Sequence, residues 1–257
     1  MATQAYAVEK IDIGRIVSRT FGAIGRNPLL YFGIAIAGLF LPSLVFRFAV
    51  IPTAAPGAVP NPLALLPYTL AGGLFGVILN VVAQAMLTHA TVTDLSGSRP
   101  TFSNCVKTAL PLILPLIGVG LLVYFGIVLG MILLIVPGII LALMWSVSVP
   151  ALVEERRGVV ASMSRSRALT KGSRWRLFGL FLVAGIILFI PPAIIAGFAT
   201  RLQGSAIPSP LSPAALLGSL VGSLAAMLLA TIVAAAYVEL RTVKEGATVE
   251  SLALIFD

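Results

Sequence analysis

The chain has 257 residues, of which 59% are hydrophobic and only 10% are charged. A water-soluble domain carries about 25% charged residues, so this composition excludes a water-facing globular surface and indicates an integral membrane protein. One cysteine excludes a framework of intramolecular disulfides, and one histidine excludes most histidine-based metal sites.

Six apolar stretches are long enough to cross a bilayer, because a transmembrane helix needs about 20 apolar residues. They predict an all-α integral membrane fold, with about six transmembrane helices in hairpins and amphipathic interfacial helices on the cytoplasmic side. We expect a single polytopic membrane domain over residues 1–257, ending in a cytoplasmic tail at 239–257. The predicted spans are residues 28–50, 68–92, 110–128, 131–152, 177–200 and 214–238.

The third and fourth spans are inferred from the length of one uncharged segment. No charged residue occurs from Ala109 to Val153. A single helix of that length would be roughly twice as long as the bilayer is thick, so the segment must fold back as a hairpin. The turn is expected between Gly126 and Gly138, with Gly130 and the Pro137-Gly138 pair as candidate helix breakers.

The basic residues lie on one side of the predicted spans. Four precede the first span, two follow the second, seven follow the fourth and two follow the sixth; Arg47 and Arg201 are the other two. By the positive-inside rule, the amino end, the even-numbered connections and the carboxyl end are cytoplasmic. The net charge of +8 therefore indicates anionic lipid headgroups and not nucleic acid.

Residues 10–26 predict an interfacial helix capped by Asp12. At 100° per residue its apolar side chains fall on one face and its arginines on the other, as expected for a helix lying in the membrane surface. Related patterns start at Thr101, Gly158 and Thr248, and the one at Gly158 is weaker. They indicate either three repeats of an interfacial helix plus a hairpin, followed by a half-repeat at the carboxyl end, or only that polytopic proteins commonly have amphipathic helices before their spans. The candidate lipid-headgroup residues are Arg15, Arg19, Arg165, Arg167, Lys171, Arg174 and Arg176.

Three polar residues fall inside or near the end of the second span, namely Asn80, Gln84 and His89. They could line a polar pathway, or they could form hydrogen bonds between helices. The sixth span carries small residues at a spacing of four, which predicts a close packing seam within the monomer or at a dimer contact. The seam consists of Gly218, Gly222, Ala226, Ala230 and Ala234.

The sequence contains no catalytic constellation. Neither a Ser-His-Asp or Cys-His set, nor an HExxH motif, nor a P-loop, nor a CxxC pair occurs, and the acidic residues avoid the span centres. The prediction is therefore a protein that is not an enzyme, with no cofactor and no metal site.

Three segments carry a family resemblance. The middle one contains Pro137-Gly138-Ile139, Trp145, Pro150, Glu154 and the run from Arg165 to Arg176. The other two contain Ile13-Gly14 near the amino end and Tyr237 to Arg241 near the carboxyl end. Together they resemble the membrane domain found ahead of glycerophosphoryl diester phosphodiesterase catalytic domains and its stand-alone relatives, which are uncharacterised bacterial inner-membrane proteins.

The resemblance implies a multi-pass helical bundle in a bacterial inner membrane, with both termini cytoplasmic. It does not imply the phosphodiesterase reaction, which belongs to a separate soluble barrel with a histidine pair; this chain has one histidine. The resemblance suggests lipid metabolism as the biological context of the protein, by association with the family only.

Three functions fit these features. The first is a non-enzymatic membrane protein that engages anionic phospholipid headgroups, or a membrane partner, through its basic cytoplasmic face. The second is a small-solute transporter or channel, suggested by the polar residues and the internal repeat. The third is a membrane scaffold or assembly factor that uses the packing seam. The expected partners are membrane lipids, with a membrane protein or a second copy of the chain as further alternatives.

Overall fold

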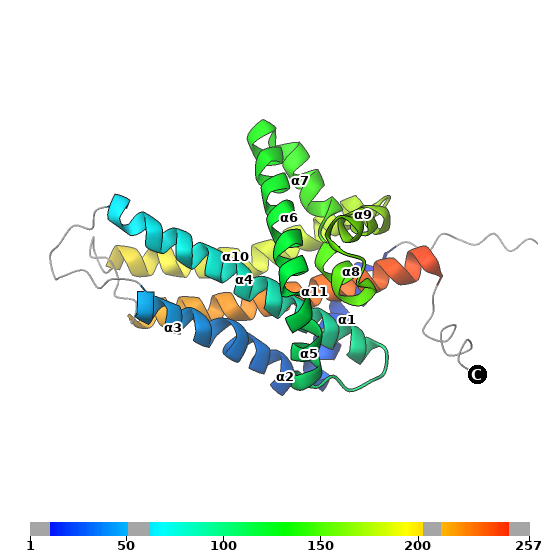
Figure 1. Cartoon of the computed structure of the whole chain (residues 1–257), viewed down its shortest axis with the longest axis horizontal. Helices are drawn as coiled ribbons and strands as arrows, with labels where there is room; N and C mark the ends of the chain where they lie inside the picture. The colour runs from blue at the N-terminus through cyan, green and yellow to red at the C-terminus, as the bar shows by residue number, and fades with distance from the viewer. Residues whose placement is uncertain (1–10, 51–61, 203–211, 247–257) are drawn as a thin grey trace, which may run out of the picture.

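The computed structural model describes residues 11–50, 62–202 and 212–246, and every element in these ranges is helical (Figure 1). The α-helices are α1 (Ile13–Arg26), α2 (Pro28–Gly33), α3 (Leu41–Val50), α4 (Pro62–Leu95), α5 (Phe102–Ala109), α6 (Ile113–Leu133), α7 (Ile135–Met144), α8 (Ser148–Glu155), α9 (Val159–Thr170), α10 (Arg174–Leu202) and α11 (Pro213–Glu245). A π-helical turn, η1 (Ile34–Phe40), joins α2 to α3, and a short 3-10 turn, η2 (Leu110–Leu112), joins α5 to α6.

The predicted fold class is confirmed. The described residues form six helical segments that are long and apolar enough to cross a membrane, and they contain no strand. Each segment covers most of one predicted span, and Phe102–Leu133 also includes the first three residues of the predicted fourth span. The six are Pro28–Ala49, Leu66–Leu95, Phe102–Leu133, Ile135–Glu155, Arg174–Ile195 and Pro213–Glu245.

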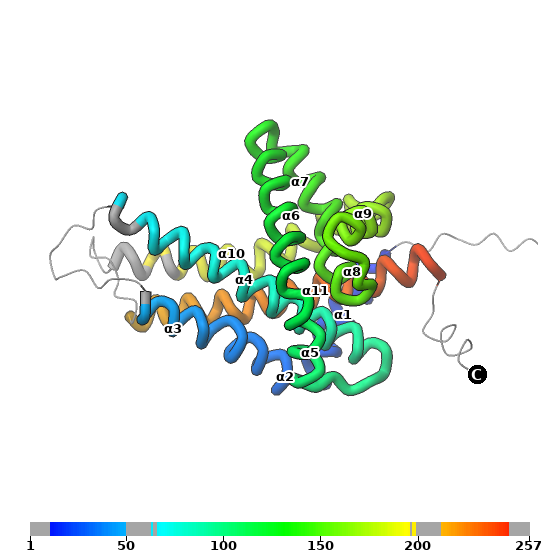
Figure 2. The backbone as a smooth tube through the Cα atoms, in the orientation of Figure 1, coloured from blue at the N-terminus to red at the C-terminus, as the bar shows by residue number. Residues whose placement is uncertain are grey.

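The core of the molecule forms around α4 and α11, which pack along each other and against η1 (Figure 2). Helix α10 lies on α11, and α1 crosses the carboxyl half of α11. Most of the side chains of α11 from Ala230 to Leu240 are buried. Helices α1, α5, α8 and α9 gather at one end of the bundle, which is called the basic end below (Figure 1).

Helices α6 and α7 form a hairpin that projects away from the direction of α11 (Figure 1). The turn is at Leu134, whose backbone is extended (φ −163°, ψ 143°), within the interval that the sequence predicts. Gly130 and Gly138, the candidate helix breakers, do not end a helix: Gly130 lies within α6 and Gly138 within α7. A Cβ atom on Gly130 would lie 2.9 Å from Gly138 Cα, so the missing side chains let the two helices touch.

The fourth predicted span is interrupted at residues 145–147, between α7 and α8. Ser166 of α9 closes the gap, since its Oγ accepts a hydrogen bond from Val147 N (3.3 Å) and donates one to Met144 O (2.8 Å). Thr170 Oγ1 also contacts Met144 O (3.4 Å), in addition to donating to Ser166 O of its own helix (2.9 Å). A break in a spanning helix requires such partners, because lipid offers none to free backbone groups. The serine face of α9 therefore packs inward, which explains why the amphipathic pattern at Gly158 is weak.

Candidate functional site

Helix α1 is fixed to the bundle by one half of its predicted apolar stripe. Asp12 caps the helix, and its Oδ1 accepts hydrogen bonds from Gly14 N (2.8 Å) and Arg15 N (3.3 Å). Ile16 and Ile24 are buried in the core, with Thr20 and Ala23 beside them. The other half of the stripe stays exposed at Ile13, Val17 and Phe21. The helix thus presents one apolar face to the protein and another to its surroundings.

Two of the predicted headgroup residues of α1 bind a carboxylate of the same chain. The side chain of Glu239 in α11 is completely buried. It lies 3.0 Å from Arg15 Nε and 2.7 Å from Arg19 Nη1, and it also accepts from Asp12 N at 3.3 Å. A buried carboxylate needs such partners because the interior cannot solvate its charge. Arg15 and Arg19 therefore tie the first described helix to the last.

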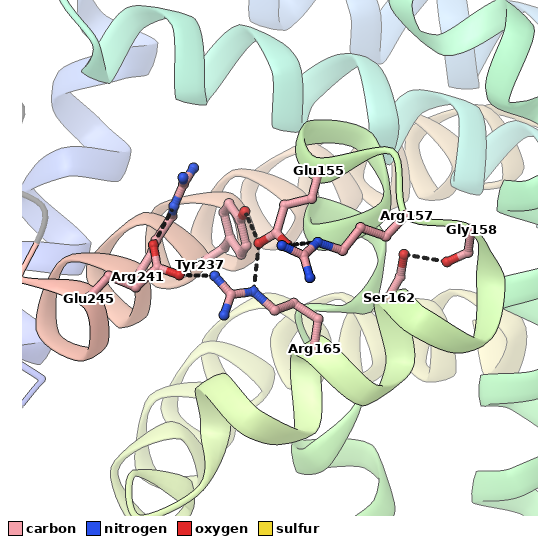
Figure 3. A network of polar contacts seen from close by, with 8 residues as sticks. All are labelled: Glu155, Arg157, Gly158, Ser162, Arg165, Tyr237, Arg241 and Glu245. Atoms are coloured by element: carbon pink, nitrogen blue, oxygen red, sulfur yellow. Dashed lines mark hydrogen bonds and ion pairs between the residues drawn. The ribbon is translucent and has the colours of Figure 1, made fainter. Parts of the chain in front are cut away.

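A second network joins α8, α9 and α11 (Figure 3). Glu155 accepts from Arg165 Nε (2.7 Å) and from the Tyr237 hydroxyl (3.0 Å), and its other oxygen pairs with Arg157 (2.8 Å). Arg165 also donates to Glu245. Burial alone would lower the pKa of Arg165, but the hydrogen bonds to Glu245 and Glu155 outweigh it and hold that pKa above its usual value. A third predicted headgroup residue is thus committed to internal contacts.

A separate group of polar contacts joins the ends of α1 and α4. Asp94 accepts from Arg26 Nε (3.1 Å) and from Asn27 Nδ2 (2.7 Å). The hydrogen bond to Asp94 raises the pKa of Arg26. Arg26 faces water over more than half of its side chain, so this pair adds little to stability.

The other four predicted headgroup residues lie where α9 turns into α10, and we call this set the α9–α10 corner. Arg167, Lys171 and Arg176 are exposed, and Arg174 is half-buried. No carboxylate among the described residues pairs with any of the four. Arg176 donates to the carbonyl oxygen of Ile11 (2.7 Å), which leaves its charge uncompensated, and the Nε of Arg174 is buried without a hydrogen-bond partner in the described chain. The corner therefore concentrates positive charge that the bundle does not neutralise.

Trp175 lies within this corner, and 85% of its surface is exposed. Its ring meets that of Phe178 edge to face, with centroids 6.0 Å apart. Exposed tryptophans at the end of a spanning helix are typical of the level of lipid headgroups. The aromatic and the cations thus occupy one surface.

The three polar residues of α4 do not converge on one site. Asn80 is exposed, and its Nδ2 donates to Gly76 O of its own helix (2.9 Å). Gln84 is half-buried. His89 Nδ1 lies 3.6 Å from Glu154 Oε1 of α8, a partner that the sequence alone does not indicate.

The predicted seam on α11 divides into two parts. Ala230 and Ala234 are buried in the bundle, and Ala226 is half-buried. Gly218 and Gly222 are exposed, and a Cβ atom added to either would meet no atom within 4 Å. Only the part of the seam near the basic end packs within the described chain.

Sequence reasoning missed the partners of these side chains. Glu239 pairs with Arg15 and Arg19 of α1, and Glu155 pairs with Arg165 of α9 as well as with its sequence neighbour Arg157. Ser166 carried no signal beyond a weak amphipathic pattern. Among the described residues there is no group of three histidine, cysteine or acidic side chains that could hold a metal ion.

Comparison with known proteins gives one match. The model of a family described as a domain of unknown function, DUF7847, matches residues 11–240. No curated protein and no solved structure matches significantly. The matched residues include α1, the α9–α10 corner and Glu239.

Proposed function

The chain belongs to the DUF7847 family, and we propose that it is a non-enzymatic, multi-pass membrane protein that engages anionic phospholipid headgroups through the α9–α10 corner. The observation that carries this proposal is the division of the basic residues. Arg15, Arg19 and Arg165 bind carboxylates of the chain, whereas the residues of the corner bind none among the described residues. The corner also contains the exposed Trp175 at the start of a membrane-length helix.

Electrostatics supports lipid as the partner of this surface. Each lysine or arginine near an anionic membrane surface gains about 1 kcal/mol from it. Arginine at the corner also suits a phosphate group, because its planar guanidinium donates two parallel hydrogen bonds. The basic end then faces the cytoplasm by the positive-inside rule. A bacterial inner membrane and a lipid context are part of the proposal, and they are based on the sequence resemblance to the membrane domain of glycerophosphoryl diester phosphodiesterases.

Fluorescence of Trp175 tests the proposal. The chain has two tryptophans, so Trp145→Phe leaves Trp175 as the only reporter. In nanodiscs, brominated anionic lipid should quench Trp175 more than brominated zwitterionic lipid at the same mole fraction. Neutralising two residues in Arg167→Gln/Lys171→Gln should remove about 2 kcal/mol of attraction, and so lower the apparent affinity for the anionic lipid about 30-fold.

A matched control removes the same charge elsewhere at the basic end. Arg99 and Lys107 are exposed and form no ion pair with the described residues. Arg99→Gln/Lys107→Gln should leave the quenching of Trp175 within a factor of two. Equal quenching by both lipids, or equal effects of the two double variants, would show that the corner does not select headgroups.

Transport of a small solute is a second candidate, favoured by the interruption between α7 and α8. Broken spanning helices are a recurring feature of transporter binding sites. A panel of small solutes in proteoliposomes tests it, with Ser166→Ala as the variant that disturbs the break. Absence of flux for the folded wild-type protein would remove this candidate.

A scaffold role is a third candidate, favoured by the exposed glycines of α11. Gly218 and Gly222 leave room for the backbone of another helix. Gly222→Leu tests this role, because a bulky side chain there would block such a contact.

A further inference from the structure

An apolar cleft lies between the α6–α7 hairpin and the bundle. Its volume is about 410 Å³. One wall is formed by Met131, Ile139 and Leu143 of the hairpin, and the other by Phe178, Phe181 and Phe189 of α10. Leu229 and Val233 of α11 close its base. The lining is apolar except for Ser146, whose hydroxyl already donates to Leu143 O (2.9 Å), so the cleft offers water or a polar solute few hydrogen bonds.

The hairpin wall of the cleft is held together by contacts within the hairpin and at its base. Gly130 and Gly138 bring α6 and α7 into contact, and Ser166 secures the end of α7. Empty space in an apolar cleft forfeits van der Waals contacts, and an apolar group that fills it gains them. The cleft therefore favours an apolar occupant.

The cleft begins beside the α9–α10 corner. Phe178, at one end of the cleft, touches Trp175 of the corner, and Arg174 lies one helical turn before Phe178. From Arg174 to Phe189 the helix rises about 22 Å, at about 1.5 Å per residue. That is about the length of a phospholipid acyl chain, so one lipid could place its headgroup at the corner and one chain along α10.

We propose that the cleft binds one acyl chain of an anionic phospholipid whose headgroup lies at the α9–α10 corner. The headgroup half of this inference rests on the proposed function, and the chain half rests on the cleft. Charge complementarity selects this occupant, because Lys171 and Arg174 of the neighbouring corner have no carboxylate partner among the described residues. An apolar helix from a second copy would leave those charges unmatched, and a zwitterionic lipid would neutralise them only in part.

Gly185 offers a way to fill the cleft without disturbing the fold. It lines the cleft, and a Cβ atom added to it would meet no atom within 4 Å. Gly179 has the same freedom, but it lies on another face of α10 and outside the cleft. Gly185→Leu and Gly179→Leu are therefore matched variants of one helix. Ala142→Phe fills the cleft from the opposite wall and serves if Gly185→Leu fails to fold.

The experiment is native mass spectrometry of the full chain after reconstitution with phosphatidylglycerol or phosphatidylcholine and extraction in mild detergent. We expect one retained phosphatidylglycerol per chain, a fall of about tenfold for Gly185→Leu or Ala142→Phe, and no change for Gly179→Leu. Retention that is equal in Gly185→Leu, Ala142→Phe and wild type would overturn the chain site.

The two halves of the inference fail separately. If the cleft variants lose lipid but Arg167→Gln/Lys171→Gln does not, the chain site stands and the headgroup proposal falls. If the charge variant loses lipid but the cleft variants do not, the reverse holds. A change from dimer to monomer in the cleft variants would show that a second copy fills the cleft, and would overturn the inference.

Discussion

Glu239, near the end of α11, accepts a 2.7 Å hydrogen bond from Arg19 of α1, a residue 220 positions earlier in the chain. The same carboxylate binds Arg15 and the backbone N–H of Asp12. The pair defines what the basic residues of α1 do in the folded protein, since they hold two distant helices together.

Replacing Glu239 with alanine should therefore release α1. The substitution removes the buried carboxylate that Arg15 and Arg19 both contact, although both arginines are about a third exposed and can turn towards water. Because of that exposure we expect a loss of about 2 kcal/mol, below the cost of breaking a fully buried pair. Thermal unfolding in detergent measures it, and faster proteolysis within residues 10–26 would locate it. Arg99→Gln is the control, and an equal loss there would contradict the assignment.

Ser166→Ala should destabilise the break between α7 and α8. The substitution leaves Val147 N–H without the bridging hydroxyl, whereas Met144 C=O keeps the longer contact from Thr170 Oγ1 (3.4 Å); an unsatisfied buried group costs about 1–3 kcal/mol. Ser164→Ala is the matched control, because Ser164 is exposed on the same helix. Denaturant titration of both variants compares them. Equal midpoints would mean that water or lipid satisfies the break equally well.

Gly138→Ala should weaken the hairpin. The new Cβ would lie 2.8 Å from Met131 N, so the two helices would have to separate, at a cost of about 1–3 kcal/mol. Gly73→Ala serves as the control, since a Cβ there meets no atom within 4 Å. A cysteine pair across the hairpin, at Met131 and Ile139, would report the separation as slower disulfide formation. Unchanged rates and stability for Gly138→Ala would contradict the close approach.

Larger side chains should destabilise the buried part of the α11 seam but not its exposed part. Ala234→Leu places three extra carbons in a filled core and should cost about 1–3 kcal/mol. Gly222→Leu should leave the unfolding midpoint unchanged, because that position is open. If the exposed glycines form a contact between chains, Gly222→Leu would also lower the fraction of dimer in crosslinking. A monomeric wild-type protein, unaffected by this variant, would remove the motive for a scaffold role.

The membrane fold follows from local features of the sequence. Apolar length predicts the six spans, and the uncharged run from Ala109 to Val153 predicts the hairpin, because both depend only on neighbouring residues. The exact position of the hairpin turn was harder to predict from the sequence. In the sequence, Gly130 and Gly138 look like helix breakers. In the structure they face each other and let α6 and α7 touch, a contact that the sequence alone does not reveal.

The partners of the charged residues could not be predicted for a similar reason. Helical periodicity separates Ile16 from Arg15 and Arg19, but it cannot say whether the polar face meets lipid or protein. The answer depends on Glu239, which reaches α1 only after the whole bundle is assembled. The α9–α10 corner was easier to anticipate, because its four cations lie within ten residues of one another in the chain.

The contact between α1 and Glu239 also sets an order of events during synthesis. Arg15 and Arg19 leave the ribosome 220 or more residues before their partner, a delay of roughly 10–40 s at about 5–20 residues per second. Throughout that interval α1 has an exposed apolar side and two cations without Glu239. Anionic lipid headgroups are then counter-ions within its reach, so the nascent helix would rest on the membrane surface until α11 inserts and exchanges lipid phosphate for a carboxylate. The last helix would complete the assembly by releasing the first from the lipid.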